Sequence, residues 1–108
     1  MDIQVIGRHV DVPDDVADYA REKASKLPRF YDRIHKIDFV LDHEGEQFTA
    51  EMIVRVDQKN TFVASDTGPD TFALIDLVVD KIERQLVKHK EKNRNHKRDG
   101  KPDLGIEP

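Results

Sequence analysis

Residues 37–56 carry the sequence IDFVLDHEGEQFTAEMIVRV, and the architecture of the chain can be worked out from this segment. Apolar side chains alternate with polar ones in each half, which is the period of a half-buried β-strand. The turn signal Glu44-Gly45-Glu46 separates the halves, so the two strands should pair as an antiparallel hairpin. One face of this hairpin is expected to be apolar, and it consists of Ile37, Phe39, Leu41, Phe48, Ala50, Met52, Val54 and Val56.

Two shorter strands are predicted outside the hairpin. Near the N-terminus, Ile3 and Val5 alternate with polar neighbours, and Ile6 is expected to be buried at the end of that strand. Residues 61–65 form the predicted last strand, and the polar, Gly- and Pro-containing residues 66–70 then break the pattern.

A first helix of about four turns is predicted between the first strand and the hairpin, from the 3.6-residue spacing of its apolar side chains. Asp11, Asp14 and Asp15 crowd its N-terminal end, where the helix dipole favours negative charge. Pro13 suits the first turn, and Pro28 is expected to stop the helix one residue after Leu27.

A second, longer helix is predicted after residues 66–70. Its apolar residues recur every three or four positions, and no Gly or Pro interrupts it before Gly100. The expected buried stripe consists of Phe72, Ile75, Val79, Ile82 and Leu86.

These elements predict an α+β fold with the order β-α-β-β-β-α, a four-stranded mixed sheet with two helices packed on one face. The first helix should link two parallel strands through a right-handed crossover. A chain of 108 residues is expected to form one domain. We place this domain at residues 1–94 and predict a flexible tail at residues 95–108, which lack apolar periodicity.

The composition limits the location and chemistry of the protein. The chain has no Cys, which excludes a disulfide framework and suits a reducing cytoplasm. No apolar run is long enough for a signal peptide or a membrane span, so we expect a cytoplasmic protein without a membrane partner.

Positive charge is concentrated in the segment KIERQLVKHKEKNRNHKR, residues 81–98. The whole chain has 18 Lys and Arg against 22 Asp and Glu, yet this segment has a net charge of +6 and the other 90 residues have −10. On a helix, Lys81, Arg84, Lys88 and Lys92 share an arc of about 80° that points away from the predicted core. Lys90 and Arg94 extend the charge around the last turns.

Two interpretations of this basic stripe remain open. Cations near a helix C-terminus complement the dipole, and a charged face is often only a solvated face. Glu83 and Glu91 are too few to balance the stripe, however, so we favour binding to a polyanion. The first helix and its exit add Arg21, Lys23, Lys26, Arg29 and Arg33, and two adjacent helices could bring their basic faces together over one groove. Such a surface would recognise phosphate spacing and shape rather than base sequence.

No other pattern indicates an active site. The five His residues lack metal-site spacing, so we expect neither a metal nor another cofactor. Asp38, Asp42 and Glu44 are interpreted as the solvent face of a half-covered sheet. Ser25 and Ser65 lack the context of a nucleophile, and no Gly-rich phosphate loop occurs. We expect no catalytic residues and no small-molecule substrate, hence no enzyme.

Two motifs nevertheless resemble a known family, the short ribosome hibernation factors, also labelled ribosome-associated inhibitor or sigma-54 modulation protein. In that family a strand ending in G-x-x-V/I leads to a helix with the core D/E-Y-x-x-x-K-x-x-K-L. A similar pattern is formed here by Gly7, Val10, Asp18, Tyr19, Lys23, Lys26 and Leu27. The family's A-I-D-x-x-x-D-K-L-x-R-Q-L-x-K-H-K-x-K resembles FALIDLVVDKIERQLVKHKEK, residues 72–92. The resemblance covers about residues 1–93.

The resemblance implies a β-α-β-β-β-α fold similar to a double-stranded-RNA-binding domain. It implies binding to 16S rRNA in the decoding channel of the small ribosomal subunit, on free subunits or 70S ribosomes, and silencing of translation by occlusion of mRNA and tRNA. We expect a short family member without the extra C-terminal domain that pairs ribosomes, and a monomer off the ribosome. The resemblance maps rRNA contacts onto Lys23, Lys26, Arg29, Lys81, Arg84, Lys88, His89, Lys90 and Lys92, with those of the second helix ranked first.

Two alternatives from other classes remain. A general double-stranded-RNA-binding module of similar fold would bind naked duplex RNA as well as it binds ribosomes. A protein-interaction regulator would instead contact an acidic partner through the basic helix, and its RNA binding would be weak.

Overall fold

The computed structural model describes residues 2–29, 31, 33–57 and 60–99, with side chains described as far as Glu91. It confirms the predicted α+β order and adds a short 3-10 helix, η1, after the first helix. The elements are β1 (Asp2–Arg8), α1 (Asp14–Ala24), η1 (Leu27–Arg29), β2 (Lys36–Glu44), β3 (Gln47–Arg55), β4 (Thr61–Gly68) and α2 (Thr71–Asp99).

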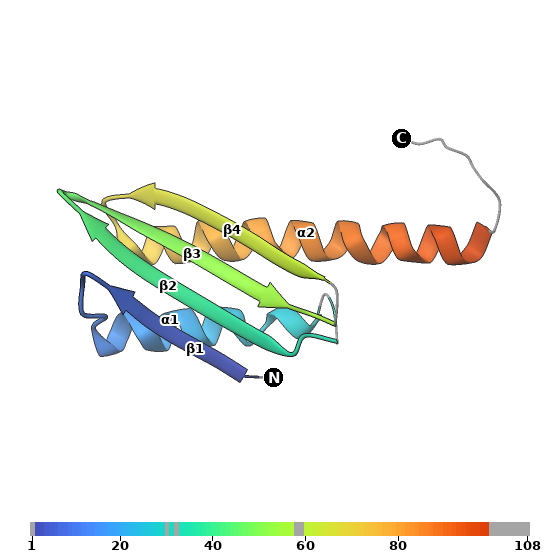
Figure 1. The fold of residues 1–108 in the computed structure, drawn as a ribbon, viewed down its shortest axis with the longest axis horizontal. Coiled ribbons are helices and arrows are strands. Elements are labelled where there is room, and N and C mark those ends of the chain that lie inside the picture. Colours follow the sequence, from blue (N-terminus) through green and yellow to red (C-terminus); the bar gives the residue numbers. More distant parts are fainter. Residues whose placement is uncertain (1, 30, 32, 58–59, 100–108) are drawn as a thin grey trace.

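The four strands form one mixed sheet in the order β1-β2-β3-β4. β1 is parallel to β2, whereas β2 with β3 and β3 with β4 are antiparallel, as the hairpin pattern predicts. Both helices lie on the same face of the sheet, and the other face is open (Figure 1).

The two helices run in the same direction, and the strand order explains why. β1, β2 and β4 all point one way, since β3 alone is antiparallel to its neighbours. α1 returns from the end of β1 to the start of β2, and α2 turns back directly from the end of β4. Both helices therefore begin at one end of the domain and finish at the other (Figure 1).

The core lies between the sheet and the helices. The hairpin contributes the predicted face, of which all members except the partly buried Phe48 are buried. α2 buries Leu74, Ile75, Val78, Val79, Ile82 and Leu86. The prediction was wrong for Phe72, which is 38% exposed, because it lies at the first turn of α2, on the side that faces α1.

Two predicted element boundaries were wrong. α1 ends at Ala24, earlier than Leu27, and η1 follows. Pro28 is the cause: it has no N–H to donate to the Ala24 carbonyl, and its ring would collide with that carbonyl in a continued α-helix. The turn beyond Ala24 accordingly uses i→i−3 bonds, such as Lys26 N to Lys23 O at 3.2 Å.

β4 continues to Gly68, beyond the predicted end at Ser65. Residues 66–68 pair with Ala50, Thr49 and Phe48 of the long strand β3. Their polar side chains do not prevent this pairing, because the ladder uses backbone groups that any residue except Pro provides.

The open face of the sheet is less solvated than its sequence suggests. Asp38 is only 9% exposed, so its prediction as a solvent-face residue was wrong. Its carboxylate accepts a hydrogen bond from Arg55 at 3.0 Å and lies 3.8 Å from the Lys36 ammonium, and these two long side chains cover it. Its predicted companions Asp42 and Glu44 are half-exposed and exposed, respectively.

α2 continues as a helix to Asp99, past the predicted domain end at residue 94. Residues 100–108 lie outside the described residues, so the flexible tail stays a prediction. Neither helix is long and apolar enough, over its described residues, to cross a membrane.

Candidate nucleic-acid interface

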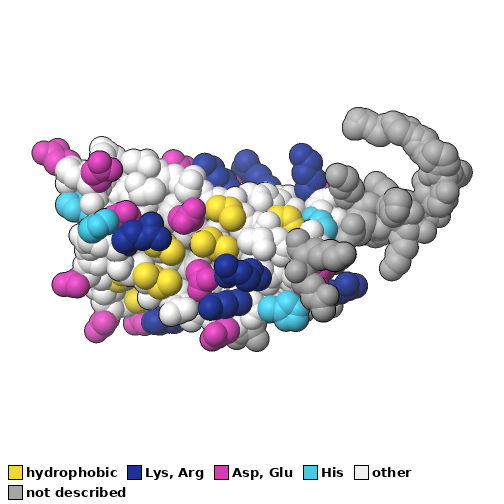
Figure 2. Space-filling view, in the orientation of Figure 1, with side chains coloured by type: hydrophobic (Ala, Val, Ile, Leu, Met, Phe, Trp, Pro, Cys, Tyr) yellow, Lys and Arg dark blue, Asp and Glu magenta, His cyan; other side chains and the backbone are white. Residues whose placement is uncertain are grey.

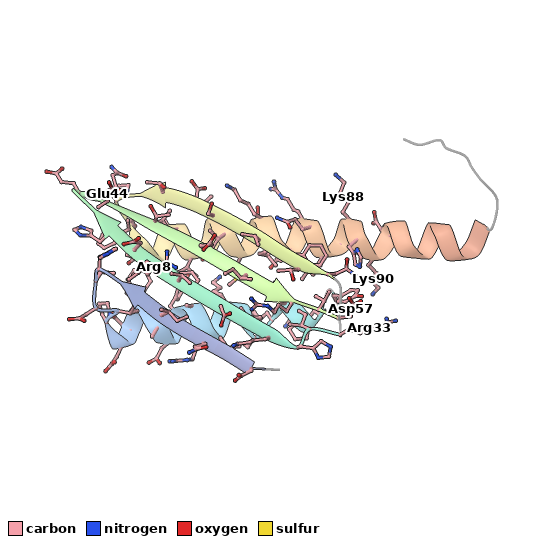
Figure 3. The ribbon with its side chains drawn as sticks, in the orientation of Figure 1. Arg8, Arg33, Glu44, Asp57, Lys88 and Lys90 are labelled. Atoms are coloured by element: carbon pink, nitrogen blue, oxygen red, sulfur yellow. The ribbon has the colours of Figure 1, made fainter. Side chains whose placement is uncertain are left out.

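Positive charge is concentrated in the C-terminal part of each helix, and α1 also begins with acidic residues. Asp14 and Asp15 open α1, while Arg21 and Lys23 close it. All Lys and Arg of α2 lie at or beyond Lys81. Because the helices are parallel, their basic ends lie at the same end of the domain, which we call the basic pole. Lys90 and Arg33 mark this pole together with Asp57 (Figure 3).

Three of the predicted contact residues are held by acids of the same chain. Lys23 lies 3.6 Å from Asp76, and Arg84 lies 2.9 Å from Asp80 one turn earlier in α2. Lys81 lies 3.3 Å from Asp66 in β4. These pairs are partly exposed and stabilise the fold weakly, yet each places a carboxylate beside a cation that a phosphate would have to approach.

Lys81 also contacts the backbone of β4. Its ammonium donates to the Ser65 carbonyl at 3.0 Å, and Gln85, one turn later, donates to the Val63 carbonyl at 3.1 Å. The pKa of Asp66 is held below its usual value, mainly by a hydrogen bond from the Thr67 N–H and also by Lys81. Lys81 therefore contributes to the sheet edge as well as to the surface charge.

A second set of cations has no acidic partner among the residues that the structure describes. It contains four predicted contact residues, all of them exposed: Lys26, Arg29, Lys88 and Lys90. We call these four the unpaired cations. They can approach a phosphate without losing an existing ion pair, so they are the best-placed members of the predicted interface.

His89 occupies a different environment. Its ring is half-buried between Tyr31, at a centroid distance of 5.5 Å, and Phe62, at 5.2 Å, and both contacts are edge-to-face. This contact fixes the second half of α2 against β4 and the α1–β2 connection. His89 therefore packs within the domain, next to the unpaired cations Lys88 and Lys90 in sequence.

The structure does not bring the basic faces of the two helices together over one groove. Between α1 and α2, Asp76 accepts a hydrogen bond from the Tyr19 hydroxyl at 2.8 Å and pairs with Lys23. Lys81 lies five residues after Asp76, about 140° further around the helix, and faces the outer edge of β4. Lys and Arg side chains line that outer edge in Figure 2, and Lys88 projects there in Figure 3.

Two further basic positions, one predicted as a contact and one not, complete the comparison. The backbone of Lys92 lies in α2, but its side chain is outside the described residues. Arg33 was not among the predicted contacts, although it is exposed and labels the basic pole in Figure 3. Its position after Pro28 in the cation-rich exit from α1 was the signal that could have identified it.

The candidate interface presents positive charge. Among the described residues, no three His, Asp or Glu side chains gather as they would around a metal ion. Guanidinium and ammonium groups without carboxylate partners suit phosphate oxygens.

Comparison with known proteins identifies the family. The family described as Sigma 54 modulation protein / S30EA ribosomal protein matches residues 3–94. The chain belongs to this family. It is 38% identical over 92 residues to a protein of Azotobacter vinelandii named ribosome hibernation promoting factor, covering 85% of each chain. It is 32% identical to the protein of that name from Escherichia coli K12, covering 89% of this chain and 100% of the relative.

Solved structures of similar proteins share the fold. The N-terminal domain of Protein Y from Thermus thermophilus superposes with a TM-score of 0.73 at 28% identity, covering 82% of this chain and 99% of that domain. A ribosomal subunit interface protein from Coxiella burnetii has a TM-score of 0.74 at 26% identity, covering 84% and 99%. The family match over residues 3–94 includes all four unpaired cations of the candidate interface.

Proposed function

We propose that this protein is a non-catalytic ribosome hibernation factor that works in the cytoplasm. It binds 16S rRNA in the decoding channel of the small subunit, alone or within the 70S ribosome. The folded domain then occupies the space of mRNA and tRNA, and translation stops. Family membership and the names of the relatives support the ribosome as the partner.

The observation that carries the choice of RNA is the set of unpaired cations. Lys26 and Arg29 lie just after α1, Lys88 and Lys90 lie in α2, and none of the four has a carboxylate partner among the described residues. Exposed cations of this kind gain most from phosphate contacts, because binding releases counterions from the RNA. An acidic protein partner would gain the same charge attraction, but the family relationship favours the ribosome.

The negative charge on the rest of the chain would orient the protein as it approaches RNA. Outside residues 81–98 the net charge is −10, so phosphates repel most of the surface. Such a charge distribution orients the basic pole toward RNA during approach and disfavours other docking orientations.

Co-sedimentation with ribosomes on a sucrose gradient tests the proposal. Wild-type protein should migrate with the small subunit and with 70S ribosomes. The variant Lys88→Gln with Lys90→Gln should remain largely at the top of the gradient. A charge-matched control compares two single variants: Lys88→Gln should weaken co-sedimentation, whereas Arg8→Gln, at an exposed position far from Lys88 in Figure 3, should migrate like wild type.

The other outcomes separate the competing functions. Wild type that stays at the top of the gradient would exclude the ribosome and favour a protein partner. Equal affinity for a naked RNA duplex and for the small subunit would favour a general double-stranded-RNA-binding module. Equal loss of binding in both single variants would show that net charge alone, and not the proposed surface, drives association.

A further inference from the structure

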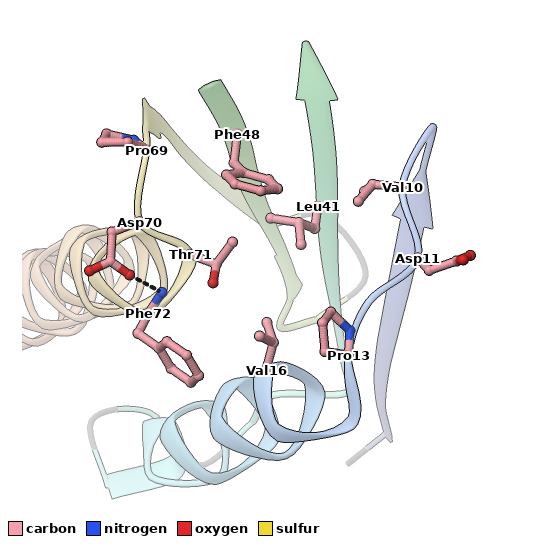
Figure 4. Close-up of a pocket in the computed structure, with 10 residues that line it drawn as sticks. All are labelled: Val10, Asp11, Pro13, Val16, Leu41, Phe48, Pro69, Asp70, Thr71 and Phe72. Atoms are coloured by element: carbon pink, nitrogen blue, oxygen red, sulfur yellow. Dashed lines mark hydrogen bonds between the residues drawn. The ribbon is translucent and has the colours of Figure 1, made fainter. Parts of the chain in front are cut away.

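Figure 4 shows an apolar pocket of about 410 Å³ beside the β1–α1 loop and the start of α2, which lie at the opposite end of the domain from the basic pole in Figure 1. Its walls come from the β1–α1 loop, α1, the sheet and the start of α2, and are formed by Val10, Pro13, Val16, Leu41, Phe48 and Phe72. A pocket of this size, lined mainly by hydrophobic side chains, is typical of ligand sites.

The pocket exists because two segments leave apolar groups uncovered. The β1–α1 loop folds back so closely that a Cβ on Gly7 would lie 2.2 Å from the Val10 carbonyl oxygen, and this places Val10 and Pro13 at the mouth. On the other side, Phe72 packs edge-to-face on Tyr19 at 5.2 Å but remains 38% exposed. An apolar side chain entering between them would gain from burying this surface.

The charge around the pocket is negative. Asp11 and Asp70 lie on opposite sides of its rim (Figure 4). Asp70 caps α2 by accepting from the Phe72 N–H at 3.0 Å. Residues 8–20, which supply the loop and most of α1, contain four acids and one cation, Arg8. Phosphates are therefore disfavoured here, and cations are attracted.

We propose that this pocket binds a basic segment of a protein, with one bulky apolar side chain inserted and flanking Lys or Arg side chains near Asp11 and Asp70. The apolar walls favour the inserted apolar side chain, and the acidic rim favours the Lys or Arg side chains on either side of it. The inference stands apart from the proposed function, because neither RNA nor a ribosome enters the argument.

Titration of the 15N-labelled protein with blocked pentapeptides, followed by NMR, tests the inference. The main probe has phenylalanine flanked on each side by two Lys or Arg residues, and amide shifts should cluster at Val10, Phe48 and Thr71. Replacing its phenylalanine by glycine should weaken binding about tenfold, because the buried apolar area is lost. A third peptide with Glu flanks should not bind.

Paired variants of the protein separate rim charge from net charge. Asp11→Asn with Asp70→Asn keeps an oxygen that can cap α2, and should weaken the basic peptide about fivefold. Asp2→Asn with Glu91→Gln removes the same charge at exposed positions elsewhere and should leave binding unchanged. No shift at millimolar peptide, shifts away from the pocket, or equal binding of the glycine peptide would each overturn the inference. Ribosome co-sedimentation is unaffected by these outcomes, so the two proposals fail separately.

Discussion

The ammonium of Lys81 donates a hydrogen bond to the carbonyl of Ser65, 3.0 Å away on the outer edge of the sheet. Gln85 makes the equivalent contact to Val63 one turn further along α2. β4 is an edge strand, and unpaired carbonyls on such a strand are a template for pairing with another chain. One helix face thus covers part of an edge that would otherwise be open.

Removing this cover should promote self-association. The double variant Lys81→Ala with Gln85→Ala is expected to lose roughly 1 kcal/mol of stability in urea denaturation, since these are exposed hydrogen bonds. It should also form dimers or larger species in light scattering, whereas wild type is expected to be monomeric. Arg84→Ala, on the same helix but paired with Asp80 rather than with β4, should remain like wild type. A monomeric double variant would contradict the edge-protection argument.

The salt dependence of RNA binding should distinguish unpaired from paired cations. Lys88→Gln and Lys90→Gln should each reduce the slope of log affinity against log salt by about one unit. Lys81→Gln and Arg84→Gln should reduce it less, because Asp66 and Asp80 already lie 3.3 Å and 2.9 Å from these cations. Filter binding to 30S subunits at several salt concentrations provides the measurement. Equal slopes for all four variants would show that the intramolecular pairs open on binding.

Gly7 should be intolerant of any side chain. A Cβ there would lie 2.2 Å from the Val10 carbonyl oxygen, so Gly7→Ala must displace the β1–α1 loop, at a cost of roughly 1–3 kcal/mol. Gly68→Ala is the matched control, because its Cβ would meet Leu74 at 3.6 Å, an ordinary contact. Urea denaturation of both variants tests the difference, and similar stabilities would refute it.

Tyr19 should titrate above its usual range. The hydrogen bond to Asp76 raises the pKa of the Tyr19 phenol by favouring its neutral form. Because the folded-state pKa is the higher one, this contribution to stability is complete below the usual value of 10.0 and is lost as pH rises through the folded-state pKa. NMR titration of the phenol carbon measures it, and Asp76→Ala should bring the pKa of Tyr19 down. No change in that variant would assign the shift to another group.

Local sequence determined most of the architecture. The alternation in residues 37–56 predicted the hairpin and its buried face, because a strand with one face in the core must repeat every two residues. The three-four spacing of Ile75, Val79, Ile82 and Leu86 likewise predicted the buried side of α2. The cation-rich ends of both helices were also visible in the sequence.

The tertiary structure decided which of these side chains are buried, which are held in ion pairs, and which are free to contact a binding partner. Asp38 is covered by Lys36 and Arg55, and Phe72 lines a pocket, although their periodicity suggested the opposite burial. Lys81 and Lys88 lie on one helix stripe, yet only Lys81 reaches Asp66 in β4. Periodicity reports which face of an element a residue occupies, because that depends on the local backbone alone. Burial and pairing depend on neighbours that chain topology brings from elsewhere, and these contacts exist only once the sheet and helices have packed.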